Sequence, residues 1–139
     1  MKKIIMTVIL VFALSCSAFS AIIDMESVSK TGSFGGYTML DGVTYTTTAY
    51  SNTLAFPFPM SAFTINIVLA GGTVSAMSTT LEGSLDGSNW FTLSTYTNTS
   101  GESAHVVNKP VMFIRVGHSK TVATSTPAVT VKVSGAKGL

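Results

Sequence analysis

The feature that most constrains the fold is a strict alternation of side-chain character along two segments. Every second residue from Phe63 to Leu69 is large and apolar, and Val129, Val131 and Val133 repeat the pattern near the C-terminus. Successive side chains of a strand point to opposite faces, so each segment predicts a strand with one buried face. No window has the i, i+3, i+4, i+7 apolar spacing of an amphipathic helix. We therefore expect an all-β chain.

Further segments bounded by Gly, Pro, Asn or Ser extend this expectation, and they comprise Tyr37–Leu40, Val43–Tyr50, Val74–Leu85, Asn89–Tyr96 and Val111–His118. The abundance of hydroxyl residues, 20 Thr and 18 Ser, also suits strands. Asp41-Gly42 and Asp86-Gly87 predict tight turns, because Gly accepts a positive φ there. An alternative for Asp86, with Ser88 and Asn89, is a fragment of a calcium loop. Seven to nine short strands predict an antiparallel β-sandwich of the jelly-roll or discoidin-like kind, or a small barrel.

The N-terminus has the pattern of a secretory signal peptide. Lys2 and Lys3 precede an apolar run, and small residues surround Phe19, so we expect residues 1–20 to be removed after Ser20. The run is too short for a membrane span. A single domain, residues 21–139, would then be secreted, periplasmic, at a cell surface or in a virion. Cys16, the only cysteine, stands in an imperfect lipid-attachment box, which makes lipid anchoring the less favoured alternative.

The charge and motif content narrow the function classes. Without the leader, six basic residues face six acidic ones, so the basic footprint of a nucleic-acid-binding protein is absent. No catalytic, cofactor or metal-binding motif is present. Ser84, His105 and Asp86 can be grouped on paper as a hydrolytic triad, but such a grouping arises by chance among 18 serines. We expect a non-enzymatic protein without cofactor or metal, in which His105 and His118 are either solvated or singly hydrogen-bonded.

Two sets of aromatic and apolar residues are candidates for binding. Phe56, Phe58 and Met60 alternate with prolines, which predicts an edge or a connection. They either plug the open end of the core or form an exposed patch for a protein partner. If the chain binds sugars, the stacking candidates are the four tyrosines, Tyr37, Tyr45, Tyr50 and Tyr96.

Arg115 stands inside the apolar segment Val111–Val116. A guanidinium on such a strand must reach water or an acceptor, because an unpaired buried charge is costly. We expect it to pair with Glu82 or a backbone carbonyl, with ligand binding as the alternative.

Two segments together resemble a known family. Leu81–Leu93 (LEGSLDGSNWFTL) and Lys109–Val116 (KPVMFIRV) are similar to linked features of discoidin-type, galactose-binding-like β-sandwiches, and more closely to small β-sandwich domains of tailed-phage virion proteins. The resemblance spans about residues 81–133. It implies a fold signature of Asp86 and Gly87 in a turn, Trp90 in the core and Arg115 on the later strand. It carries over no ligand-binding residue.

These observations favour a domain that functions by binding other molecules and not by catalysis. We expect a structural, adhesive or virion-associated module that binds other protein chains or copies of itself, because a neutral, hydroxyl-rich surface does not repel its copies. The alternative is a carbohydrate-binding module with a glycan ligand.

Overall fold

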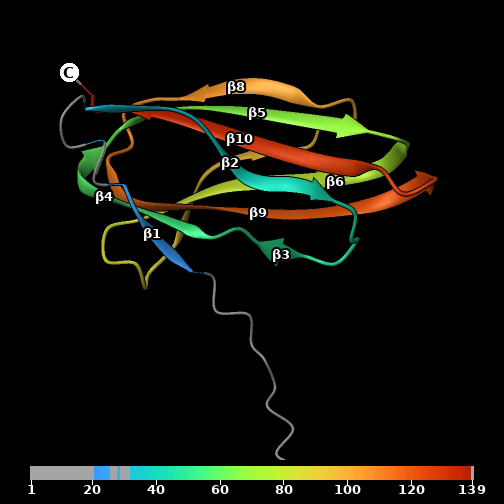
Figure 1. Cartoon of the computed structure of the whole chain (residues 1–139), viewed down its shortest axis with the longest axis horizontal. Helices are drawn as coiled ribbons and strands as arrows, with labels where there is room; N and C mark the ends of the chain where they lie inside the picture. Colours follow the sequence, from blue (N-terminus) through green and yellow to red (C-terminus); the bar gives the residue numbers. More distant parts are fainter. Residues whose placement is uncertain (1–20, 26–27, 29–31, 139) are drawn as a thin grey trace, which may run out of the picture.

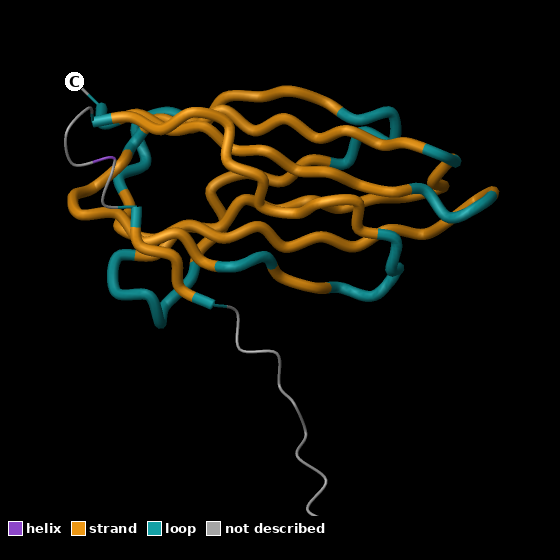
Figure 2. Tube along the Cα trace, in the orientation of Figure 1, coloured by secondary structure: helices purple, strands orange, loops and turns teal. Residues whose placement is uncertain are grey.

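The computed structural model describes residues 21–25, 28 and 32–138, which form two packed sheets (Figures 1 and 2). The strands are β1 Ile22–Asp24, β2 Ser33–Val43, β3 Ala49–Tyr50, β4 Thr53–Met60, β5 Ala62–Ala70, β6 Thr73–Ser84, β7 Phe91–Tyr96, β8 Glu102–Val106, β9 Val111–Thr124 and β10 Ala128–Ala136. The expected all-β sandwich is confirmed, with ten strands in the described ranges instead of seven to nine. The leader and Cys16 lie outside them. No helix among the described residues is long and apolar enough to cross a membrane.

One sheet has six strands and the other has four. The six-stranded sheet runs β1-β4-β9-β6-β7, with β3 also paired to β9, and the four-stranded sheet runs β2-β10-β5-β8. All pairings are antiparallel except β1 with β4. The long β6–β9 ladder, from Thr73↔Thr124 to Ser84↔Phe113, forms the middle of the six-stranded sheet.

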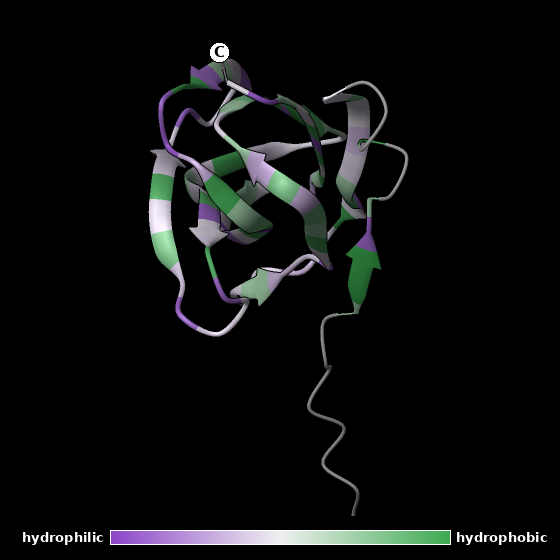
Figure 3. Ribbon diagram, turned by 90° about the vertical axis from the view of Figure 1, so that its left-hand side faces the viewer, coloured by the Kyte–Doolittle hydropathy of each residue, from purple (hydrophilic) through white to green (hydrophobic). Residues whose placement is uncertain are grey.

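The core lies between the sheets and follows the predicted alternation. Phe63, Ile65 and Ile67 are buried from β5, and the three valines of β10, which occupy every second position, are fully buried beside them. Apolar and polar bands alternate along the strands when the sandwich is seen from its end (Figure 3). In β9 the inward residues include Ile114 and Val116, while Arg115 between them faces outward.

The Asp41-Gly42 hairpin is a wrong prediction, and of the Val43–Tyr50 strand only Val43, in β2, and Ala49–Tyr50, which form β3, lie in strands. β2 runs straight through Asp41-Gly42 and ends at Val43. On β10, Val129 pairs with Val43 and Val131 with Leu40, so β2 carries one extra residue there. Gly42 has a φ of 58°, and the dipeptide therefore forms a β-bulge instead of a turn. Such bulges disrupt the outer edge of β2, which hinders pairing with another chain.

The proline-containing end of β4 plugs the core. β4 pairs with β9 at Leu54 and Ala55 and again only at Met60, so the intervening residues leave the ladder. Phe56 is buried and stacks on Phe34, with ring centroids 5.4 Å apart, and Met60 is fully buried. Phe58 is half-buried beneath the Lys137 ammonium, 5.3 Å from its ring centroid. An exposed patch made of Phe56, Phe58 and Met60 is therefore excluded.

Gly135 tests how tightly this end is packed. A Cβ on Gly135 would collide with the Phe34 ring and lie 3.1 Å from the Phe63 ring. We expect Gly135→Ala to lower the free energy of unfolding in urea by about 1–3 kcal/mol, because an overpacked core must shift. Gly36→Ala is the matched control, since its Cβ would lie 3.9 Å from the nearest atom, Ser134 Oγ. Equal stability of the two variants would contradict the packing described here.

Candidate functional site

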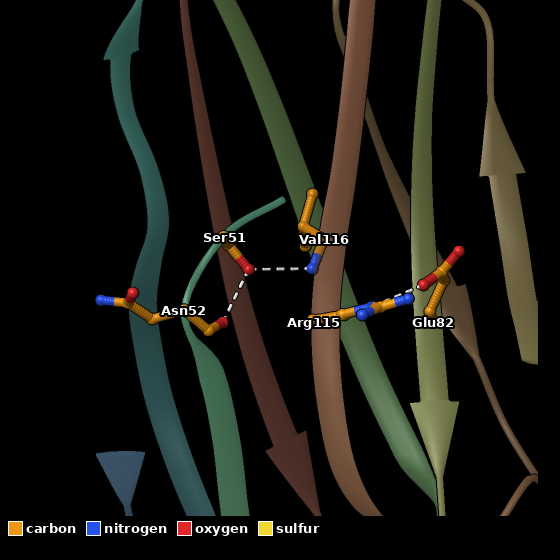
Figure 4. A network of polar contacts seen from close by, with 5 residues as sticks. All are labelled: Ser51, Asn52, Glu82, Arg115 and Val116. Atoms are coloured by element: carbon orange, nitrogen blue, oxygen red, sulfur yellow. Dashed lines mark hydrogen bonds and ion pairs between the residues drawn. The ribbon is translucent and has the colours of Figure 1, made fainter. Parts of the chain in front are cut away.

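The outer face of the six-stranded sheet carries a stack of two aromatic rings and one guanidinium. The Arg115 guanidinium carbon lies 4.2 Å from the Tyr50 ring centroid and 4.1 Å from the Trp90 ring centroid. Arg115 Nε donates to Glu82 Oε2 at 2.7 Å, which is the expected ion pair (Figure 4). The side chains of Arg115 and Glu82 are only 23% and 16% exposed. We call Tyr50, Glu82, Trp90 and Arg115 the arginine stack.

The strand register assembles the arginine stack. Glu82 of β6 lies directly opposite Arg115 of β9, where opposite charges on neighbouring strands stabilise the pair. Tyr50 of β3 lies opposite Gly117, two residues beyond Arg115 on the same outer face. A Cβ on Gly117 would come within 2.9 Å of the Tyr50 ring. The glycine therefore lets the tyrosine lie against the sheet beside Arg115.

Ser51 fixes the connection that carries Tyr50. Its backbone N–H donates to Val116 O at 2.8 Å, and its Oγ accepts from Val116 N at 2.9 Å. The same hydroxyl donates to Asn52 O at 2.7 Å (Figure 4). This short link between β3 and β4 is thus tied to β9 next to Arg115, which limits the movement of the adjacent Tyr50.

The loop after β6 positions Trp90. Asp86 Oδ1 accepts from the backbone N–H groups of Ser88 and Asn89, both at 2.8 Å, and Gly87 turns the chain with a φ of 74°. These hydrogen bonds, with those from the Asn89 and Ser84 side chains, hold the pKa of Asp86 well below its ordinary value. The carboxylate is therefore occupied in ordering the loop.

Trp90 itself corrects a prediction. It was expected in the core, but it is only half-buried and lies against Arg115 on the outer face. The register explains this position, because Phe91 pairs with Gly83 and the tryptophan before it turns to the face of Glu82. A tryptophan that covers a cation gains a cation–π contact, which the core would not offer.

The four tyrosines do not form one sugar-stacking surface. Tyr96 is buried, and Tyr37 is half-buried against the core. Tyr45 is 39% exposed in the connection between β2 and β3. Tyr50, 49% exposed, is the tyrosine that the structure places beside other candidate residues.

Two polar residues are buried on the inner face of β9. The expectation of a solvated His118 is wrong, whereas the alternative of a singly hydrogen-bonded imidazole agrees with the structure; Lys120 was not singled out from the sequence. His118 is 1% exposed, and its Nδ1 lies 2.8 Å from Thr79 Oγ1. Lys120 is also buried, and its Nζ donates to Val43 O at 2.6 Å and Pro127 O at 2.7 Å. The period of two from Ile114 places both residues inside, a signal that could have found them. Lys120 ties the ends of β2 and β10 to β9.

The triad of Ser84, His105 and Asp86 is not assembled. Ser84 Oγ donates to Asp86 Oδ1 at 3.0 Å within the loop. His105 belongs to β8 of the other sheet, where its Nδ1 lies 2.9 Å from Thr64 Oγ1. Among the described residues, no group of three His, Cys, Asp or Glu side chains is placed to hold a metal ion.

Comparisons with protein-family models, curated proteins and solved structures found no match to this chain.

The position of Trp90 leads to a stability prediction. We expect Trp90→Ala to stay folded and to lose about 1–2 kcal/mol of unfolding free energy, because it removes a half-exposed ring and one cation–π contact. Loss of a core aromatic would cost about 3–5 kcal/mol. Urea unfolding followed by circular dichroism distinguishes the two ranges, and a loss in the higher one would place Trp90 in the core after all.

His118 leads to a pH prediction. Burial, and then the nearby Lys120 charge, lower the pKa of His118 from 6.5 to about 4. The unfolded chain thus binds a proton that the native chain excludes, so stability is full above pH 6.5 and falls as the pH drops toward 4. This shift is worth about 3 kcal/mol. We expect the free energy of unfolding in urea to fall less between pH 7 and pH 4 in His118→Asn than in the natural chain, because the variant has no buried imidazole to protonate. An equal fall in the unfolding free energy of both proteins would show that His118 is not the source of this pH dependence.

Proposed function

We propose that this chain is a non-catalytic, exported contact domain that binds other protein chains, first of all further copies of itself. Its role is structural or adhesive, at a cell surface or in a virion. The arginine stack on the outer face of the six-stranded sheet carries this proposal. The leader pattern of residues 1–20 supports export.

The residue types of the stack support a protein contact. Trp, Tyr and Arg are the residues most enriched among those that dominate binding energy in protein interfaces. Here one of each meets at a single place on the sheet, with ring centroids 4.1 and 4.2 Å from the guanidinium carbon. Tyr50 and Trp90 keep part of their surface open to solvent, so a partner could bury it.

The stack is also held in place before any partner arrives. Arg115 is fixed by Glu82 at 2.7 Å and by a ring on either side. Immobilising a long side chain on binding normally costs about 0.5–1.5 kcal/mol. A pre-ordered arginine avoids most of that cost, which favours its use as a binding anchor.

Exposed apolar side chains flank the stack in the sequence. Leu85 is 63% exposed at the start of the loop after β6, and Phe91 is 45% exposed directly after Trp90. A partner chain would gain by burying these side chains, and the balanced charge outside the leader does not repel an identical copy.

Light scattering coupled to size-exclusion chromatography tests the proposal over a range of protein concentrations. We expect a discrete oligomer that Trp90→Ala and Arg115→Met shift toward monomer. Val68→Ser removes an exposed apolar residue from the other sheet, so it serves as the control and should leave assembly unchanged. A monomer at every concentration, or an oligomer unaffected by both stack variants, would overturn the proposal.

A further inference from the structure

A groove continues from the arginine stack along the outer face of the six-stranded sheet. Two cavities, of about 250 and 80 Å³, share Ser78 and Ser119 and therefore adjoin. We define the outer groove by six residues that line one or both of these cavities, namely Thr46, Thr48, Tyr50, Ser78, Thr80 and Ser119.

Small residues on β9 create the groove. The cross-strand pairs Thr80↔Gly117 and Ser78↔Ser119 form its floor, and the connection from β2 to β3 forms one wall. Gly117 has no side chain, and Ser119 has a short one, so the sheet is hollowed between Tyr50 and Thr80. The groove has Tyr50 in common with the arginine stack.

The chemistry of the walls is neutral and rich in hydroxyls. The two charged side chains at the groove are already engaged: Glu82 pairs with Arg115, and Lys120 directs its ammonium to the carbonyls of Val43 and Pro127. Within the described part of the chain, the hydroxyls of Ser78 and Ser119 form no hydrogen bond to another residue. They are therefore available to a ligand.

The position of the groove decides what kind of ligand fits. It lies on the face of the sheet, where the backbone groups of β6 and β9 already pair with each other. An extended peptide cannot add there as a strand, because strand addition needs an unpaired edge. A ligand must instead meet side-chain hydroxyls with hydroxyls of its own and cover the flat Tyr50 ring with an apolar surface.

We propose that the outer groove binds a neutral glycan, with a sugar ring stacked on Tyr50 and sugar hydroxyls bonded to Ser78, Thr80 and Ser119. This goes beyond the proposed protein contact. It uses a neighbouring part of the same face, and Trp90 lies outside it.

The test is isothermal titration of the full chain with neutral hexasaccharides of glucose, xylose, mannose and galactose, after a glycan array that also carries sialylated and sulfated chains. We expect saturable binding of at least one neutral glycan. Tyr50→Ala should weaken it about tenfold through loss of the stacking surface. Tyr45→Ala, an exposed tyrosine outside the groove, should leave it unchanged within about twofold.

A second pair of variants separates this site from the protein contact. Ser119→Leu fills the floor of the groove and should abolish glycan binding while assembly by light scattering persists. Thr95→Leu on β7, exposed and outside the groove, is its control. No binding of any neutral glycan, preference for charged glycans alone, or binding that survives both Tyr50→Ala and Ser119→Leu would overturn the glycan site. Those results would not affect the proposed self-association, which light scattering tests separately.

Discussion

The β6–β9 ladder is the interaction on which the rest of the molecule depends. Its register assigns each residue of the two central strands to one face of the sheet, so a shift by one residue would exchange core and surface. The same register places Leu81 and Val116 in the core and Glu82 beside Arg115 outside. The core positions of both central strands and the Glu82–Arg115 ion pair are therefore consequences of one pairing, and a polar site is built without disturbing the packed interior.

Alternation along the chain was enough to predict the fold class and the inner faces of β5 and β10, and the cost of an unpaired buried charge was enough to predict that Arg115 is paired. Neither could predict contacts that depend on register. Asp41-Gly42 has the sequence of a hairpin turn, but β10 holds β2 in a continuous pairing, and the dipeptide becomes a bulge. Trp90 was expected inside because large aromatic residues gain most from burial, yet Arg115 offers it a charged partner on the outer face.

The interior is closed partly by polar groups. Lys120 bonds two backbone carbonyls, and His118 contacts Thr79, so two hydrophilic side chains occupy the inner face of β9. The Lys120 ammonium binds one carbonyl at the end of β2 and one just before β10, so it links these two segments to β9 at the cost of its own desolvation. These hydrogen bonds also direct the Lys120 amine inward. The outer surface at this end of β9 therefore presents hydroxyl groups, and the groove stays neutral.

Trp90 is the only tryptophan of the chain, so its fluorescence reports directly on the arginine stack. The measurement that tests the central claim is acrylamide quenching of the native chain and of Arg115→Ala, with the unfolded chain in urea as the reference. The account predicts clear quenching of the native chain, below that of the unfolded chain, and stronger quenching once Arg115 no longer covers one face of the ring. A native tryptophan that acrylamide does not reach, with no change in Arg115→Ala, would contradict it.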